Sequence, residues 1–342
     1  MPNRSPARRR LWAAIRAGAI VAIVVGSAVA VYAERSMIGS GLTSFRHSNV
    51  GWVVAGFGAE CVSMAAFALL QGRLLRAAGT RLTFGSLLAI AYTSNAVALA
   101  VPVAGSGLAA AYTQRRFRAR GADAAAVSLA LLVAGVISTL AFAVMVAIGA
   151  VQSGNPVAAV AGLLTSVCCA AAAGVLVVAL HLPQGRARLR PPVAYAIRLS
   201  QRLVHRPAGD PAAIASGLLQ RLGAFNLGLP AIAVAFWCAV INWVADLGCL
   251  AAAVAAIGGS VPWGKLLLVW SAGAAAASFS PTPYGLGIVD IALITALSRA
   301  GLRSPDAVGA VLLYRIITFK IAVTLAWIAY RYIADRARRV AL

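Results

Sequence analysis

Acidic residues are scarce in this sequence, which contains 8 Asp and Glu against 30 Lys and Arg in 342 residues. Charged residues of both signs reach only 11%, whereas hydrophobic residues make up 61%. A soluble domain carries roughly 25% charged residues, so this composition excludes an ordinary soluble globular protein. Several apolar stretches reach the roughly 20 residues that a membrane-spanning helix needs. They cover residues 50–70, 122–151, 157–182, 229–257 and 307–328.

Residues that bind metals or carry out catalysis are also few. The 3 histidines and 5 cysteines do not have the spacing of metal ligands, and every cysteine lies in an apolar stretch. The sequence contains no Gly-Lys-Ser/Thr phosphate loop, no His-Glu-x-x-His and no Gly-x-Ser-x-Gly. We therefore expect no metal, no cofactor and no enzymatic activity. Any transport would be passive or coupled to an ion.

The net charge of +22 raises the question of a nucleic-acid partner. The arginines, however, gather at the ends of the apolar stretches, as in 8–10, 73–81, 115–120, 186–206 and 331–339. This distribution is typical of the positive-inside rule of membrane proteins, and no zinc-finger spacing or RNA-binding signature accompanies it. We expect no nucleic-acid partner, and interpret the charge as a topology signal with attraction to anionic lipid headgroups.

The N-terminus allows two interpretations. An arginine-rich segment precedes an apolar run at 17–33, and Val31-Tyr32-Ala33 resembles a signal-peptidase site. The apolar run is long for a signal peptide, which favours a retained first helix at 11–33. Both interpretations remain open, and both leave the next helix entering from the outside.

Two segments share a pattern of proline and glycine. Each has a proline, then Gly-x-Gly, then a third glycine fourteen residues later, followed by a long apolar stretch. A shift of 180 residues places Gly105, Gly107 and Gly121 on Gly285, Gly287 and Gly301, with Pro102 and Pro283 just ahead of the pairs. The shared pattern indicates an internal repeat.

Proline and glycine within an apolar stretch break a helix, because proline lacks a backbone donor and glycine allows a turn. The apolar arms at 84–101 and 266–280 end at these breaks, and shorter arms return at 107–118 and 287–298. We predict two re-entrant hairpins. Irregular backbone at membrane depth must be buried by protein or reached by water, so the hairpin tips are expected to line a cavity.

The predicted fold class is all-α: a polytopic membrane bundle of about six full transmembrane helices plus two broken hairpins, arranged as inverted repeats. The whole chain forms one integral membrane domain, with repeat units at 50–151 and 229–333 and a linking helix at 157–182. Cytoplasmic N- and C-termini in the cell membrane place most of the Lys and Arg inside. The hairpins then enter from opposite faces, and a site is expected near the midplane, where half-helix N-termini meet anionic groups.

The segment 184–226 between the repeat units is basic. Arg198, Arg202 and Arg206 lie four residues apart, on one face of a helix, with apolar residues elsewhere. This pattern suits a helix on the cytoplasmic membrane surface. A solvated basic connector explains it equally well.

Charged residues inside the apolar stretches are the most informative. They are Glu60, Asp246, Asp290, Arg315 and Lys320. Each costs about 2.5–3.5 kcal/mol at the bilayer centre on insertion scales, so each needs a polar cavity or a partner. A substrate-binding role and a structural ion pair both remain open. Arg315 cannot lose its charge, and we expect it to pair with Asp290 directly or across water.

The stretch SPTPYGLGIVDIALITALSRAG, continuing to LLYRIITF, resembles the signature of the lysylphosphatidylglycerol synthase transmembrane-domain family, or flippase-like domain. That signature has a Pro-x-Pro-Gly-Gly-x-Gly loop, an acidic residue, a glycine and an arginine in the last helix. Pro281, Pro283, Gly285, Gly287, Asp290, Gly301 and Arg315 fill it, and an upstream element is matched by Asn95, Pro102 and Gly105. The resemblance covers roughly residues 10–335.

Some positions depart from the family pattern. Tyr284 replaces a usual glycine, Asp290 replaces a usual glutamate, and Val103 and Ala104 replace a basic residue. The sequence ends at Leu342, so we expect no soluble aminoacyl-transferase domain.

The resemblance implies movement of a lipid with a phosphate or other anionic headgroup between leaflets. Secondary transport of a small solute remains open. So does a role as non-catalytic partner of a lipid- or glycan-synthesis enzyme, and so does self-association into a homo-oligomer.

Overall fold

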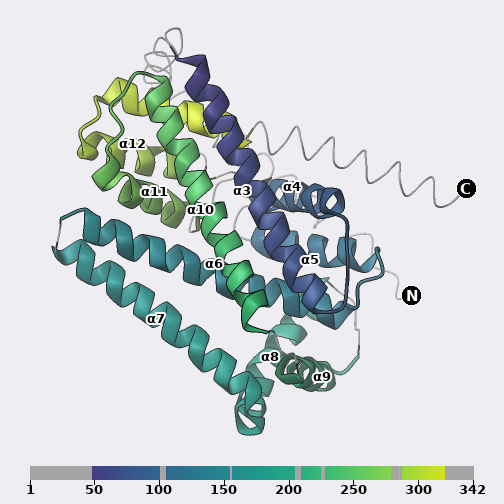
Figure 1. The fold of residues 1–342 in the computed structure, drawn as a ribbon. Coiled ribbons are helices and arrows are strands. Elements are labelled where there is room, and N and C mark those ends of the chain that lie inside the picture. The colour runs from purple at the N-terminus through teal and green to yellow at the C-terminus, as the bar shows by residue number, and fades with distance from the viewer. Residues whose placement is uncertain are drawn as a thin grey trace, which may run out of the picture. The chain divides into compact units, whose positions relative to one another are not determined.

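A computed structural model describes residues 48–100, 105–154, 156–204, 209–224, 228–278, 285 and 287–319 (Figure 1). Within these ranges the chain is helical with no strand, as the predicted all-α class requires. The helices are α3 (Val50–Ala77), α4 (Phe84–Ala100), α5 (Gly105–Arg118), α6 (Ala124–Gln152), α7 (Pro156–His181), α8 (Pro183–Val204), α9 (Pro211–Ala224), α10 (Leu229–Ala256), α11 (Trp263–Ser278) and α12 (Ile288–Ala300). Residues 304–319 form a further helix.

Three of the described helices are long and apolar enough to cross a membrane: Val50–Ala77, Ala126–Gln152 and Pro230–Ala256. They correspond to the predicted spans at 50–70, 122–151 and 229–257. The spans predicted at 157–182 and 307–328 are helical at 156–181 and 304–319. The first helix predicted at 11–33 lies outside the described residues.

The chain divides into two compact units. The first unit draws on Met1–Glu60, Asn95–Ala109 and Leu247–Thr324, and the second on Cys61–Ser94, Ala110–Asp246 and Leu325–Leu342. Helices α3, α4, α5 and α10 contribute residues to both units.

Close helix contacts hold the first unit together. A Cβ at Gly56 of α3 would lie 3.1 Å from Ile317 Cδ1 and 3.4 Å from Ala252 Cβ of α10, so glycine lets these helices approach. The Asn49 N–H donates to the Ala256 carbonyl at 2.7 Å. Helices α11 and α12 pack on one another, and a Cβ at Gly273 would lie 2.5 Å from Leu293 Cδ2. Small residues therefore set the spacing, as is common between membrane helices.

The second unit is organised by the pair α6 and α7. The Ser166 hydroxyl of α7 donates to the Ala143 carbonyl of α6 at 2.5 Å. The Trp243 indole N–H of α10 donates to the Ser138 carbonyl of α6 at 3.1 Å, and its ring lies 5.4 Å from that of Phe142. These bonds give otherwise costly polar groups a partner within an apolar bundle.

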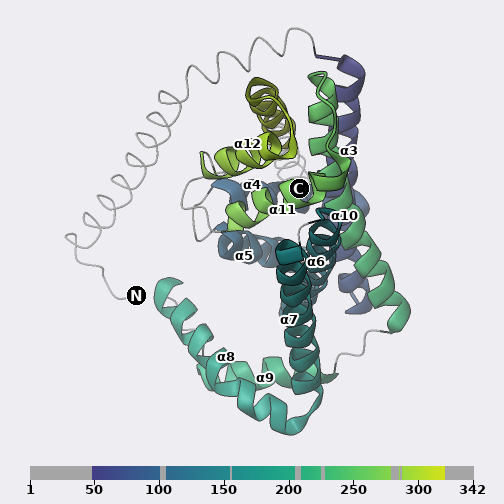
Figure 2. The ribbon, with the colours of Figure 1, turned by 90° about the vertical axis from the view of Figure 1, so that its left-hand side faces the viewer.

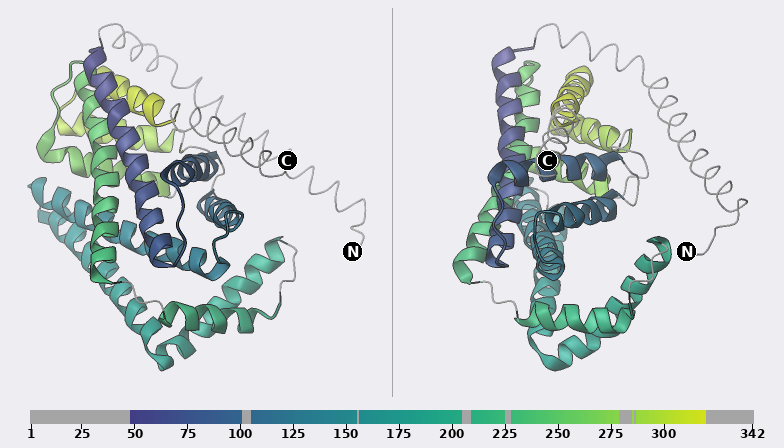
Figure 3. Two further views of the ribbon diagram at one scale, coloured as in Figure 1. Left: turned by 45° about the vertical axis from the view of Figure 1, so that its right-hand side comes forward. Right: turned by 90° about the vertical axis from the view of Figure 1, so that its right-hand side faces the viewer.

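The described residues of the segment predicted at 184–226 include two helices, α8 and α9. They pack on each other, and α9 also packs on α6 and α7. Figures 2 and 3 show both helices at the end of α7 where the chain leaves it.

The helices of the two predicted repeat units have similar lengths. Helices α3 and α10 each have 28 residues, α4 and α11 have 17 and 16, and α5 and α12 have 14 and 13. Helix α6 begins at Ala124, and the helix after α12 begins at residue 304, a difference of 180. The element order is therefore the same in both halves.

The helices of the two predicted repeat units also end with similar hydrogen bonds. The Gly121 and Ala122 N–H groups donate to the Arg118 and Phe117 carbonyls. With the same shift of 180, Gly301 and Leu302 donate to Ser298 and Leu297. Gly121 and Gly301 both adopt positive φ, at 85° and 114°.

The end of α3 repeats with a shift of 179. Gly79 donates to Arg76 and Thr80 to Leu75, just as Gly258 donates to Ala255 and Gly259 to Val254. All four helix ends therefore use the same glycine-terminated bonding pattern, which is a common way to end a helix.

Candidate functional site

The chain turns into α12 at two glycines of the second hairpin. Gly285 and Gly287 have φ of +65° and +83°, a conformation that strains any residue with a side chain. A Cβ at Gly285 would lie 2.5 Å from Val289 Cγ2 and 3.5 Å from Arg315 Nη2. The buried Gly285 therefore lets the backbone run directly beside the guanidinium.

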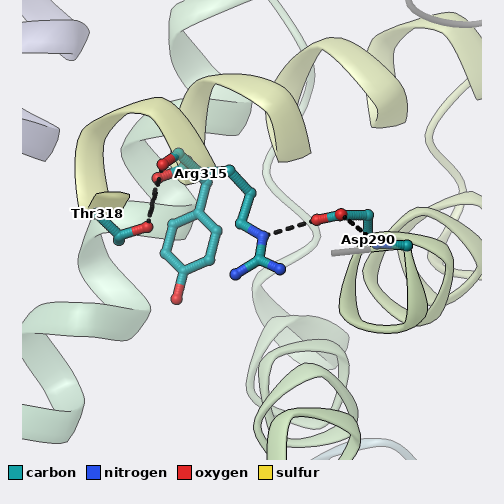
Figure 4. Close-up of polar contacts among 5 residues, drawn as sticks. Asp290, Arg315 and Thr318 are labelled. Carbon is teal, nitrogen blue, oxygen red and sulfur yellow. Dashed lines mark hydrogen bonds and ion pairs between the residues drawn. The ribbon is translucent and has the colours of Figure 1, made fainter. Parts of the chain in front are cut away.

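Asp290 lies in the first turn of α12. Its Oδ2 accepts a hydrogen bond from the Gly287 N–H at 2.9 Å. Its charge is favourable there, because the N-terminal end of a helix carries a partial positive charge. Its Oδ1 accepts a hydrogen bond from Arg315 Nε at 2.6 Å (Figure 4).

Arg315 belongs to the helix at 304–319. The expectation that it pairs with Asp290 is confirmed, since the contact is direct. The side chains of Arg315 and Asp290 remain 22% and 19% exposed, so the pair is mostly buried but still accessible to solvent. One turn later the Thr318 hydroxyl donates to the Tyr314 carbonyl at 3.0 Å, which keeps it bonded to its own helix.

The corresponding tip of the first hairpin is built differently. Gly105 is the first residue of α5 and is buried, and a Cβ there would collide with the Ala98 carbonyl of α4. Gly107 lies within α5 and faces open space, with nothing within 4 Å of a Cβ. Asn95, on α4, is partly buried. Backbone contact thus excludes a side chain at position 105, whereas nothing nearby excludes one at position 107.

The remaining predicted site residues are spread more widely. Glu60 is 5% exposed and belongs to the first unit, as do Asp290 and Arg315. Asp246 is partly buried and belongs to the second unit. Pro102, Pro283 and Lys320 lie outside the described residues.

Several buried polar groups were missed by the sequence analysis. Asn242 Nδ2 of α10 donates to the Ser63 carbonyl at 3.0 Å and to Ser63 Oγ at 2.8 Å. Gln71 on α3 is 5% exposed, and its Oε1 has no hydrogen-bond partner among the described residues. An uncharged polar residue within an apolar stretch is the signal that could have found them.

The arrangement is suited to anions. A guanidinium and the N-terminal turn of α12 converge at Asp290, and both favour a negatively charged ligand. Across the described ranges, no group of three or more His, Cys, Asp or Glu side chains could hold a metal ion.

Comparison with known families assigns most of the chain to one family. The model of the family described as "Lysylphosphatidylglycerol synthase TM region" matches residues 18–326. The match includes Asn95, Gly105, Gly285, Asp290 and Arg315. A search of curated proteins found no match. On the extent of the family match, the chain belongs to the lysylphosphatidylglycerol synthase transmembrane-region family, which is a membrane domain.

Proposed function

We propose that this protein moves a phospholipid or a polyprenyl-phosphate-linked lipid between the leaflets of the cell membrane. The observation that carries the proposal is the partly exposed ion pair of Asp290 and Arg315 at the start of a broken helix. The headgroup passes through a polar path at this pair, while the hydrocarbon tails stay in the membrane.

The pair has the chemistry needed to hold and release a phosphate. A guanidinium is well suited to bind a carboxylate or a phosphate, and in the structure Arg315 is paired with Asp290. Asp290 places one oxygen on Arg315 and the other on the Gly287 N–H. An arriving phosphate takes over the guanidinium in a bidentate contact, while Asp290 keeps its bond to Gly287.

The repeated plan supports an inverted-repeat transporter of about six full spans. In the proposed topology both termini are cytoplasmic, and the hairpins of α4–α5 and α11–α12 enter from opposite faces. The charged pair has no counterpart in the first half, because the shift of 180 places Ala110 and Gly135 at the positions of Asp290 and Arg315. The proposed phosphate site therefore lies in the second hairpin, at Asp290 and Arg315.

In this proposal the protein is a transporter without enzymatic activity. A solute transporter would need a path closed to lipid on all sides. A non-catalytic partner of a synthesis enzyme would need no exposed ion pair. Both alternatives are outcomes of the experiment below.

The experiment measures lipid movement in proteoliposomes. Purified protein is reconstituted with fluorescent phosphatidylglycerol, and in parallel with fluorescent polyprenyl phosphate. A membrane-impermeant quencher reports the exchange between leaflets. Arg315→Lys keeps the charge but loses the planar fork, and Arg315→Gln loses both. A charged hydrogen bond is worth about 1.5–3 kcal/mol, so each variant should slow exchange by roughly ten-fold or more.

Arg303→Gln is the matched control. Arg303 Nε also pairs with an aspartate, Asp306, at 2.7 Å, but its side chain is 84% exposed. This variant should exchange lipid at the parent rate. If Arg315→Gln matches the parent in rate and stability, the pair is structural and the proposed site is wrong. If the parent does not exceed protein-free liposomes with either lipid, the partner or solute-transporter alternative stands.

A further inference from the structure

Helix α8 is strongly basic. Its 22 residues contain five arginines and no acidic residue: Arg186, Arg188, Arg190, Arg198 and Arg202. It begins two residues after α7 ends at His181. A strongly basic helix is therefore attached directly to the end of an apolar one.

One side of α8 is held by the second unit. Leu189 and Val193 pack against a cluster formed by Leu129 of α6 and Leu219 of α9. Ala194 is buried as well. These contacts fix how α8 is rotated about its axis, and so decide which residues face outward.

The outward side combines arginine with apolar surface. Arg188 and Arg198 are exposed, and so are Tyr195 at 66% and Leu199 at 46%. Tyr195, Arg198 and Leu199 are spaced by three and four residues, which places them on one face of the helix. Arg188 is exposed on the other side of Pro191 and Pro192. An exposed tyrosine and leucine between arginines is typical of helices that lie in the membrane interface. A merely solvated connector gains nothing from exposing them.

The position of α8 supports a membrane surface as its partner. Gln114 of α5 donates to Ser128 of α6 at 2.7 Å, next to Leu129, on which α8 and α9 pack. The basic end of α5, with Arg115, Arg116 and Arg118, therefore lies at the same end of α6 as α8. Figure 2 shows α8 and α9 running across that end of the α6–α7 pair rather than alongside it.

Two prolines shape α8 to such a surface. Pro191 and Pro192 are exposed within the helix and lack the N–H that would bond the preceding turn. Proline within a helix favours a bend, and a bend here would let the two halves of α8 follow the headgroup region.

We propose that the exposed face of α8 docks on the anionic headgroups of the adjoining leaflet. Arg188 and Arg198 bind lipid phosphates, and Tyr195 and Leu199 enter the interface between headgroups and acyl chains. The docking holds this end of the second unit at a fixed depth. It is independent of lipid movement at Asp290 and Arg315, and holds even if that proposed function fails.

The test uses the full chain in nanodiscs. The native cysteines are replaced by alanine, and a nitroxide is attached to a cysteine at position 195 or 199. Collision rates with oxygen and with a water-soluble nickel chelate report depth. In discs with phosphatidylglycerol both labels should favour oxygen. In phosphatidylcholine discs, or with Arg188→Gln and Arg198→Gln together, docking should weaken by about five-fold per arginine.

A second measurement keeps the native cysteines. Trypsin should cut after Arg188 and Arg198 in phosphatidylcholine discs and spare both in phosphatidylglycerol discs, while cutting after the exposed Arg303 should not change with lipid. Nickel-accessible labels together with equal cleavage in both discs would overturn the proposal. That outcome would mean that this face of α8 is only solvated, or that it binds an acidic protein.

Discussion

Gly105 and Ala98 meet backbone to backbone at the tip of the first hairpin. The Cα of Gly105 lies so close to the Ala98 carbonyl that a Cβ would overlap the oxygen and crowd the carbonyl carbon at 2.9 Å. A flexible side chain could move aside, but a backbone carbonyl of α4 cannot. The contact therefore requires glycine at the start of α5.

Gly105→Ala is accordingly expected to destabilise the protein. Overpacking of this kind costs about 1–3 kcal/mol. Gly107→Ala is the matched control two residues away, where a Cβ meets nothing within 4 Å. It should be neutral or slightly stabilising, because alanine favours the helix by about 1 kcal/mol. Unfolding of the purified protein in mixed detergent measures both, and equal stabilities would contradict the close contact.

The bond between Asn242 and Ser63 leads to a second prediction. Asn242 Nδ2 reaches both the carbonyl and the hydroxyl of Ser63. Asn242→Leu removes both bonds and should cost about 0.6–1.7 kcal/mol, the range for such bonds between membrane helices. Ser63→Ala removes one acceptor and should cost less. The same unfolding assay decides the order, and a larger loss for Ser63→Ala would contradict the geometry.

The helix breaks could be predicted because proline and glycine act locally. The starts of the returning helices were less accurate. The arms predicted at 107–118 and 287–298 begin at Gly105 and Ile288. Gly105 is helical, whereas Gly285 and Gly287 adopt positive φ. The same Gly-x-Gly spacing thus occurs in two conformations, because glycine permits both and the local sequence does not distinguish them.

The ion pair could also be predicted, since two charges in apolar segments need a partner. The Ser63–Asn242 bond could not. An amide or a hydroxyl in an apolar stretch is a weak signal, because it can bond its own helix as Thr93 and Ser271 do.

Topology gives a third prediction. Single cysteines at 119 and 260 lie at exposed positions after α5 and α10. An impermeant thiol reagent added to intact cells should label 260 and spare 119. A cysteine at the exposed Ser304, which begins the helix after α12, should label together with 260. Labelling of 119 but not 304 would reverse the proposed orientation, and labelling of 119 and 304 alike would contradict inverted hairpins.

The last prediction concerns the interaction energy between Asp290 and Arg315. A double-mutant cycle with Asp290→Ala and Arg315→Ala measures their coupling. The pair is about four-fifths buried and carries a charged hydrogen bond, so we expect about 1.5–3 kcal/mol. The same cycle on Asp306 and Arg303, exposed at 15% and 84%, should give about 0.2–1 kcal/mol.

Salt discriminates further between the two pairs. Raising the ionic strength should weaken the coupling of the exposed pair and leave the sheltered pair nearly unchanged, because screening acts through solvent. A phosphate ligand that takes over Arg315 would lower the coupling measured in its presence. Added phosphatidylglycerol could instead leave the Asp290–Arg315 coupling unchanged and weaken only the Asp306–Arg303 coupling. In that case the lipid only screens charges in general and does not displace Asp290 from the guanidinium of Arg315.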